Sequence, residues 1–80
     1  MKLFDWNNEK SEWLTRVRGI SFEEIVFHIQ AGDLIDVVTH QNPEKYPGQR
    51  ILVVEVENYA YLVPFVETAN AYFLKTIIPS

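Results

Sequence analysis

Few side chains in this sequence can support metal or nucleophilic chemistry. A metal site needs several converging His, Cys, Asp or Glu ligands, and the 80 residues contain two histidines, His28 and His40, and no cysteine. The absence of cysteine also excludes a disulfide framework. The chain has no glycine-rich phosphate loop and no Gly-x-Ser-x-Gly turn. We therefore expect no metal, no cofactor and no serine nucleophile, with His28 on a helix surface and His40 at a strand end.

Two pairs of carboxylates are close enough in sequence to act as a general acid and base. Glu23 and Glu24 are adjacent, and Glu55 and Glu57 are two residues apart. Each pair also has a structural explanation, because the first follows Ser21 as in a helix capping box and the second lies at a strand end. We favour the structural roles, since a catalytic carboxylate needs burial that this pattern does not indicate.

Positive charge is concentrated near the N-terminus of a chain whose formal net charge is −4. Residues 1–20 hold four basic and three acidic side chains, whereas residues 21–80 hold three basic and eight acidic ones. A polyanion responds to local potential, so the basic side chains of residues 1–20 can line a groove for one together with Lys45 and Arg50. The alternative is a solvated helix face stabilised by pairs such as Glu12 and Arg16.

These basic residues depend on a first helix for their positions. Residues 3–6 are short and apolar enough for a strand, and Asn7 can cap a helix that runs to Arg18 and ends at Gly19. Helical spacing predicts a buried stripe with Lys10 in its middle, so this lysine must extend to solvent or serve a function. The residues of that stripe are Trp13, Leu14 and Val17.

A second helix is predicted to begin at Ser21, because Ser21-Phe22-Glu23-Glu24 has the pattern of a capping box. Gly32 is expected to end it. Its inner face is predicted to consist of Phe22, Ile25, Val26 and Ile29. Phe27 lies off that face, so it either covers a sheet edge or stays exposed for a partner.

The remaining sequence has the pattern of strands. We expect strands at 34–40, 50–57, 59–66 and 71–78, with a loop over 41–49 and the last three strands in a meander. Residues 51–54 do not alternate, which predicts a central strand covered on both faces. Pro64 predicts an edge strand or a bulge. The result is a single α+β domain over residues 1–80, with the order β-α-α-β-β-β-β and two helices on a mainly antiparallel sheet.

The sequence has no pattern of a membrane-spanning helix or a secretory signal, which favours the cytoplasm. The apolar runs are shorter than the roughly 18 residues that a membrane-spanning helix needs, and the first residues carry no apolar signal core. We therefore expect a cytoplasmic protein without a membrane partner.

Four segments of the sequence together form a recognisable pattern: Phe4 to Lys10, Arg18 to Glu24, Ile51 to Val54 and Leu74 to Ser80. The most specific part is the Phe-x-Trp-x-x-x-Lys start joined to Gly-Ile-Ser-Phe-Glu-Glu. In this order the segments resemble the BrnT family of toxins from bacterial toxin–antitoxin systems, and the match covers nearly the whole chain.

The resemblance implies a RelE-like fold, metal-independent RNA cleavage that inhibits translation, and neutralisation by a small DNA-binding antitoxin of helical or ribbon-helix-helix type. Contact with DNA would be indirect, through the antitoxin. In such cleavage a base removes the 2′-hydroxyl proton, cations stabilise the phosphorane and an acid protonates the leaving oxygen. The candidate catalytic residues are Lys10, Arg50 and His40. The candidate substrate-binding residues are Arg16, Arg18, Lys45 and Lys75.

The resemblance includes one departure at the C-terminal end. Family members continue past the segment matched by residues 77–80 into a basic Arg-Lys stretch, whereas this sequence stops at Ser80. If that stretch supplies cations to the substrate, the present chain is expected to cleave RNA weakly.

A different class of function is a non-catalytic module that docks a small DNA-binding partner. Phe27, Tyr59 and Tyr61, with Tyr72, are aromatic residues of the type enriched at interfaces. Their alternative role is packing within the core and across strands. Purification with a single small antitoxin would separate the two interpretations.

Overall fold

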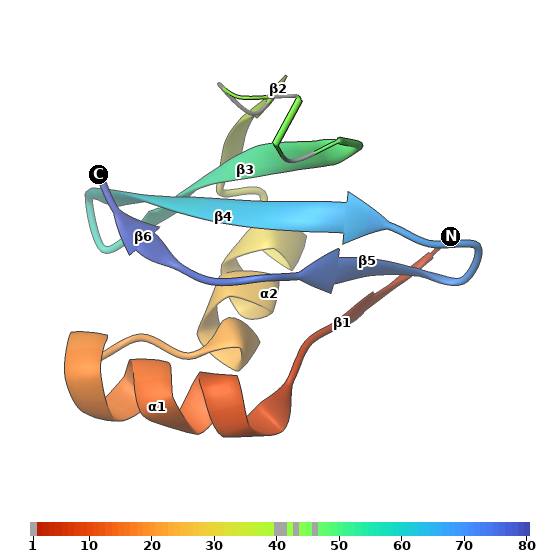
Figure 1. Cartoon of the computed structure of the whole chain (residues 1–80). Coiled ribbons are helices and arrows are strands. Elements are labelled where there is room, and N and C mark those ends of the chain that lie inside the picture. The colour runs from red at the N-terminus through yellow and green to blue at the C-terminus, as the bar shows by residue number, and fades with distance from the viewer. Residues whose placement is uncertain (1, 40–41, 43, 46) are drawn as a thin grey trace.

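The computed structural model describes residues 2–39, 42, 44–45 and 47–80 and is an α+β structure (Figure 1). Its first seven elements follow the predicted order, and one short strand is added at the end. The elements are β1 (Leu3–Asp5), α1 (Asn8–Arg18), α2 (Phe22–Gln30), β2 (Leu34–Thr39), β3 (Gln49–Val56), β4 (Tyr59–Glu67), β5 (Ala71–Leu74) and β6 (Ile78–Pro79).

Both helices begin at the predicted caps, and α1 also ends as predicted, whereas α2 is capped by Ala31, one residue before the predicted Gly32. The Asn7 side chain accepts a hydrogen bond from the Lys10 backbone N–H, and Gly19 closes α1 in the left-handed conformation at φ 70°. In α2 the Ser21 side chain accepts from the Glu24 backbone while the Glu24 side chain accepts from that of Ser21. The capping role assigned to Glu24 is therefore confirmed.

The buried side of α1 differs from the prediction. Leu14 is fully buried as expected, but Val17 is 58% exposed and Trp13 is 37% exposed. Ser11 is buried instead, and its hydroxyl donates to Glu23 and accepts from the Phe22 N–H at the start of α2. The contact side of α1 is rotated toward Ser11 because this hydroxyl satisfies a buried backbone donor of the next helix.

The sheet is mixed, with the strand order β1-β5-β4-β3-β2 and with β6 paired to β4. Strands β2, β3, β4 and β5 pair antiparallel in turn, which confirms the predicted meander. The one parallel pair joins β1 to β5, and β1 then leads on into α1 (Figure 1). The sheet is therefore mainly antiparallel, as expected.

The predicted strand over 71–78 is wrong in one respect, because it is two strands, β5 and β6, separated by residues 75–77. The Ile77 side chain is fully buried, and its carbonyl accepts a hydrogen bond from the Arg18 guanidinium. These two interactions turn the segment away from regular pairing.

Pro64 lies inside the sheet, in β4, and the prediction of an edge strand or bulge is wrong. Its carbonyl accepts from the Lys75 N–H at 2.8 Å, so its backbone polar groups face the interval between β5 and β6. The ladder is already interrupted there, and the missing N–H of proline therefore costs no pairing.

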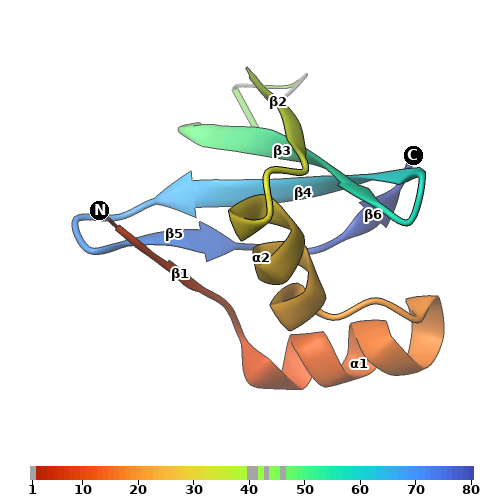
Figure 2. The same ribbon diagram turned by 180° about the vertical axis from the view of Figure 1, so that it is seen from behind.

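Strand β3 alternates, so the prediction that both its faces are covered is also wrong. Leu52, Val54 and Val56 are buried, whereas Ile51 and Val53 are only half-buried. Helix α2 lies on one side of the sheet, in front of it in Figure 2 and behind it in Figure 1. We call that side the covered face and the opposite side the open face.

The core is formed between the covered face and the helices. Its largest fully buried side chains come from both helices, from the connection between them and from the sheet. They are Phe22, Leu14, Ile20, Ile25, Leu74, Ile77, Val54 and Val63. Within the part of the chain that the structure describes, no helix has the length and apolar character needed to cross a membrane.

Candidate nucleic-acid interface

An open groove runs between α1 and β5, with a volume of about 750 Å³. The β1–β5 pairing creates it, because β1 leads directly into α1 and so brings the outer side of this helix beside β5. We call it the α1–β5 groove. Its lining residues are Asn7, Glu9, Lys10, Glu12, Trp13, Arg16, Phe73 and Lys75.

The α1–β5 groove combines cations with aromatic rings. The Lys10 Nζ lies 4.6 Å from the centre of the Trp13 ring, and the Lys75 Nζ lies 5.5 Å from that of Phe73. Arg16 adds a third cation. Cations that attract phosphate and rings on which bases stack are the two components of a single-strand nucleic-acid site.

The groove also contains two carboxylates, Glu9 and Glu12. With three cations and two carboxylates, its formal charge is about one unit positive, against −4 for the whole chain. Its local potential therefore has the opposite sign to the bulk of the molecule.

One predicted catalytic residue and two predicted substrate-binding residues line this groove, and a third predicted substrate-binding residue, Arg18, lies beside it. Lys10, Arg16 and Lys75 line the groove. Arg18 lies beside Trp13, with its guanidinium carbon 5.5 Å from the ring centre, and donates to the Ile77 carbonyl. Arg18 thus holds the 75–77 segment against α1 and positions the two walls of the groove.

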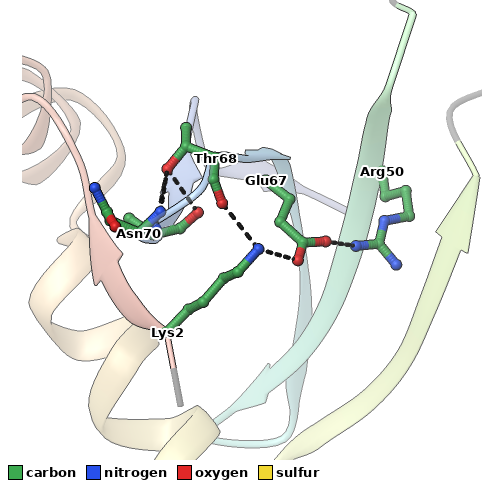
Figure 3. Close-up of polar contacts among 6 residues, drawn as sticks. Lys2, Arg50, Glu67, Thr68 and Asn70 are labelled. Carbon is green, nitrogen blue, oxygen red and sulfur yellow. Dashed lines mark hydrogen bonds and ion pairs between the residues drawn. The ribbon is translucent and has the colours of Figure 1, made fainter.

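Arg50 lies elsewhere, in a network with Glu67 and Lys2 (Figure 3). Its guanidinium donates to the Glu67 carboxylate at 2.8 Å and stacks 5.0 Å from the centre of the Phe65 ring. Arg50 and Tyr72 are among the residues that line a separate cavity of about 220 Å³. The structure does not bring Arg50 into the α1–β5 groove with Lys10.

The carboxylate of Glu67 is the centre of this network. Lys2 binds its second oxygen and also donates to the Thr68 carbonyl at 2.8 Å (Figure 3). The hydrogen bond from Lys2, with the positive charges of Lys2 and Arg50, lowers the pKa of Glu67 below its ordinary value of 4.5. The network therefore ties the β1, β3 and β4 strands together, and Arg50 has a structural partner.

Two further predicted residues are not among those that line the groove in the described part of the chain. His40 lies outside the described residues. Lys45 is in the segment between β2 and β3, where its backbone N–H donates to the Asn42 side chain.

Sequence reasoning missed the contact between His28 and Asp33. The His28 Nδ1 lies 2.8 Å from the Asp33 carboxylate, and the Asp33 N–H donates to the His28 carbonyl. A histidine in the last helical turn, followed five residues later by an aspartate beyond a glycine, is the signal that could have predicted it. The pair joins the end of α2 to the start of β2.

The aromatic residues predicted for partner binding are on two elements. Phe27, on α2, is 66% exposed, and Tyr59, on β4, is 43% exposed. Tyr61 is half-buried, with its ring centre 4.9 Å from that of Tyr59. Tyr59 also donates its hydroxyl proton to the Ser80 carbonyl, so this residue has a role within the fold.

The fold class is thus an α+β domain with two helices and a mixed six-stranded sheet. Comparisons with family models, curated proteins and solved structures found no match to this chain. Among residues 2–39, 42, 44–45 and 47–80, no three His, Asp or Glu side chains cluster as a metal site. The functional argument therefore rests on the chemistry of the α1–β5 groove.

Proposed function

We propose that the protein is a metal-independent ribonuclease toxin of a bacterial toxin–antitoxin module, of the BrnT type and with a RelE-like fold. It acts in the cytoplasm, cleaves RNA to inhibit translation and is neutralised by a small DNA-binding antitoxin. The observation that supports this proposal best is the α1–β5 groove, where Lys10, Arg16 and Lys75 gather beside two aromatic rings on an otherwise acidic molecule.

The groove contains the groups that metal-independent RNA cleavage requires. A carboxylate, Glu9 or Glu12, accepts the 2′-hydroxyl proton as the 2′-oxygen forms a bond to phosphorus. The bond from phosphorus to the 5′-oxygen breaks, and the Lys10 ammonium donates a proton to that leaving oxygen. Arg16 and Lys75 stabilise the phosphorane charge. The products are a 2′,3′-cyclic phosphate and a 5′-hydroxyl.

The aromatic rings hold the bases on either side of the cleaved bond. Trp13 is 37% exposed and Phe73 is half-buried, so both rings present a surface to a ligand in the groove. Base stacking on such rings contributes about 1–3 kcal/mol per base and depends little on sequence.

The proposal is tested with a purified protein and an end-labelled single-stranded RNA. We expect Lys10→Ala and Lys75→Ala each to lower the cleavage rate at least tenfold, because each removes a cation from the groove. Lys45→Ala is the matched control, since it removes a lysine outside the groove lining, and it should cleave at the wild-type rate. Thermal unfolding of each variant verifies that the fold is retained.

Two results would contradict this assignment. Equal loss of activity in Lys45→Ala and Lys10→Ala would show that the groove has no special role. RNA that stays intact with the wild-type protein, together with undiminished translation in a cell-free system, would leave the alternative of a non-catalytic docking module, which the exposed Phe27 supports.

A further inference from the structure

The open face of the sheet carries a continuous apolar surface. Cross-strand pairs place Ile51 beside Pro64, Val53 beside Leu62 and Val66 beside Phe73. Val38 pairs with Ile51 at one side, and Ile78 pairs with Leu62 at the other.

Most of these side chains are accessible, whereas Pro64 is buried. Val38 and Ile78 are 37% and 40% exposed, and Ile51, Val53, Leu62 and Val66 are half-buried. Figure 1 views the sheet from this side, with α2 behind it and α1 below β5. A contiguous apolar patch of this kind marks an interaction surface rather than ordinary solvent exposure.

Three carboxylates flank the patch. By the same alternation, Asp36 shares the open face through its pairing with Val53, Glu55 through Ala60, and Asp5 through Phe73. All three are exposed, and none belongs to an ion pair of the described residues. Lys75 adds a cation at the β5 side of this face, where its Nζ lies 5.5 Å from the centre of the Phe73 ring. The open face is therefore apolar at its centre and acidic on the β2–β3 side, around Asp36 and Glu55.

This combination selects among the elements that can cover a sheet. A second copy of the chain would bring two acidic surfaces together, with a net charge of −4 on each molecule. RNA phosphates would meet the same carboxylates. An amphipathic helix with an apolar stripe between basic residues satisfies both the apolar centre and the acidic side, and helices are the usual cover of an open sheet face.

The dimensions of the sheet give the length of such a helix. Five strands at a spacing of about 4.8 Å span about 19 Å, which a helix rising 1.5 Å per residue crosses in about 13 residues.

We infer that the open face binds a basic amphipathic helix of a partner protein. Its apolar stripe packs on Ile51, Val53, Leu62 and Val66, and its Lys or Arg side chains pair with Asp36 and Glu55. These contact residues lie outside the lining of the α1–β5 groove, and the two surfaces meet at Phe73, which lines the groove and pairs with Val66.

Two synthetic peptides test the inference. The first is a 14-residue helix with leucines at i, i+3, i+4 and i+7 flanked by lysines, and the second has glutamate in place of each lysine. We expect the basic peptide to bind at least tenfold more tightly by fluorescence anisotropy. Leu62→Lys should weaken it at least tenfold, and Phe27→Ala, which alters an exposed aromatic residue of α2, should leave it unchanged.

A charge reversal keeps the test decisive if Leu62→Lys fails to fold. Asp36 and Glu55 are exposed, so the double variant Asp36→Lys, Glu55→Lys should retain the fold. We expect it to prefer the acidic peptide. Lys10→Ala should bind the basic peptide as the wild type does, so failure of the ribonuclease proposal leaves this result intact.

Three outcomes would overturn the inference. Equal affinity for the two peptides, or binding of neither, would remove the charge argument. A dimer in sedimentation that Leu62→Lys dissociates would assign the face to a second copy. Loss of RNA binding in a folded Leu62→Lys variant, with Lys10→Ala unaffected, would make the open face the nucleic-acid surface.

Discussion

Ser11 joins the two helices through a buried hydroxyl, and it is the one buried polar residue in the part of the chain that the structure describes. It is buried, and its hydroxyl satisfies the Phe22 N–H at 3.1 Å while donating to Glu23 at 2.8 Å. We expect Ser11→Ala to lower the free energy of unfolding by roughly 1–3 kcal/mol, because the buried N–H loses its partner.

Chemical denaturation measures this loss, and Thr15→Ala is its control. Thr15 also donates a side-chain hydrogen bond, to the Ser11 carbonyl within the same helix, but it is exposed. Its replacement should change stability by less than about 0.5 kcal/mol. An equal decrease in the free energy of unfolding in both variants would contradict the prediction, because the Ser11 hydroxyl would then contribute no more than a hydrogen bond within one helix.

The Glu67 network predicts a pH dependence on the acid side. Lys2 and Arg50 keep the pKa of Glu67 below 4.5 in the folded protein, so the unfolded chain binds its proton more readily. The stabilisation is present above pH 4.5 and is lost as the pH falls through the lowered pKa. In Glu67→Gln the unfolding free energy should therefore fall less steeply below pH 4.5.

Lys2→Gln provides an independent check, because Lys2 is the largest cause of the lowered pKa. It should flatten the same part of the curve, and combining it with Glu67→Gln should add little. An acid limb of unchanged slope in both variants would show that the network does not contribute to stability.

The sequence predicted local residue roles well where the interactions are local. Asn7 and Ser21 lie within three residues of the N–H groups they cap, so their roles can be recognised from the pattern. The burial of Ser11 could not be predicted, because a serine is expected on the polar side of a helix unless its partner in the next helix is known. Val17 was predicted to be buried, and it is exposed because the buried side of α1 is rotated toward Ser11.

At the scale of elements, the β3–β4 hairpin has an unfavourable turn sequence. Val56 pairs with Tyr59, so Glu57 and Asn58 form a two-residue loop, and both have positive φ angles, 51° and 66°. Such a turn favours Asn-Gly. We expect the double change Glu57→Asn, Asn58→Gly to raise the free energy of unfolding by about 1 kcal/mol.

The matched control for this hairpin is Glu55→Asn, two residues earlier within β3. Asparagine is unfavourable in a strand, so this change should leave stability unchanged or lower it. Thermal unfolding of the two variants checks the prediction. A loss of stability in the turn variant would mean that the Glu57 side chain makes a contribution of its own.

The division of the last strand shows where prediction of elements stops. Residues 71–78 have strand-forming sequence throughout, and the break at 75–77 depends on Arg18 and on burial of Ile77. Pro64 was misjudged because a proline in a central strand is tolerated only where its neighbour is interrupted. The break at 75–77 and the position of Pro64 both depend on contacts between segments that are distant in sequence, so local sequence patterns do not predict them.

At the scale of the whole molecule, the candidate site depends on long-range contacts, above all on one strand pairing. Lys10 and Arg16 were predicted from the helix, and Lys75 from the C-terminal motif, but nothing in the sequence joins them. The parallel β1–β5 pair does so, and it leaves Arg50 with Glu67 on a different part of the sheet. Residue types were therefore predictable, whereas their grouping required the fold.

The contrast between a cationic groove and an acidic molecule predicts how RNA binding depends on salt. Each cation that neutralises a phosphate of single-stranded RNA contributes about −0.7 to the slope of log K against log salt concentration. Lys10, Arg16 and Lys75 together should give a slope of about −2. Lys75→Ala should reduce its magnitude by about 0.7, and Lys45→Ala should not change it. Anisotropy titrations of a labelled RNA across a range of salt concentrations measure these slopes. A slope near zero, or one that Lys45→Ala changes as much as Lys75→Ala, would show that phosphate does not enter the α1–β5 groove.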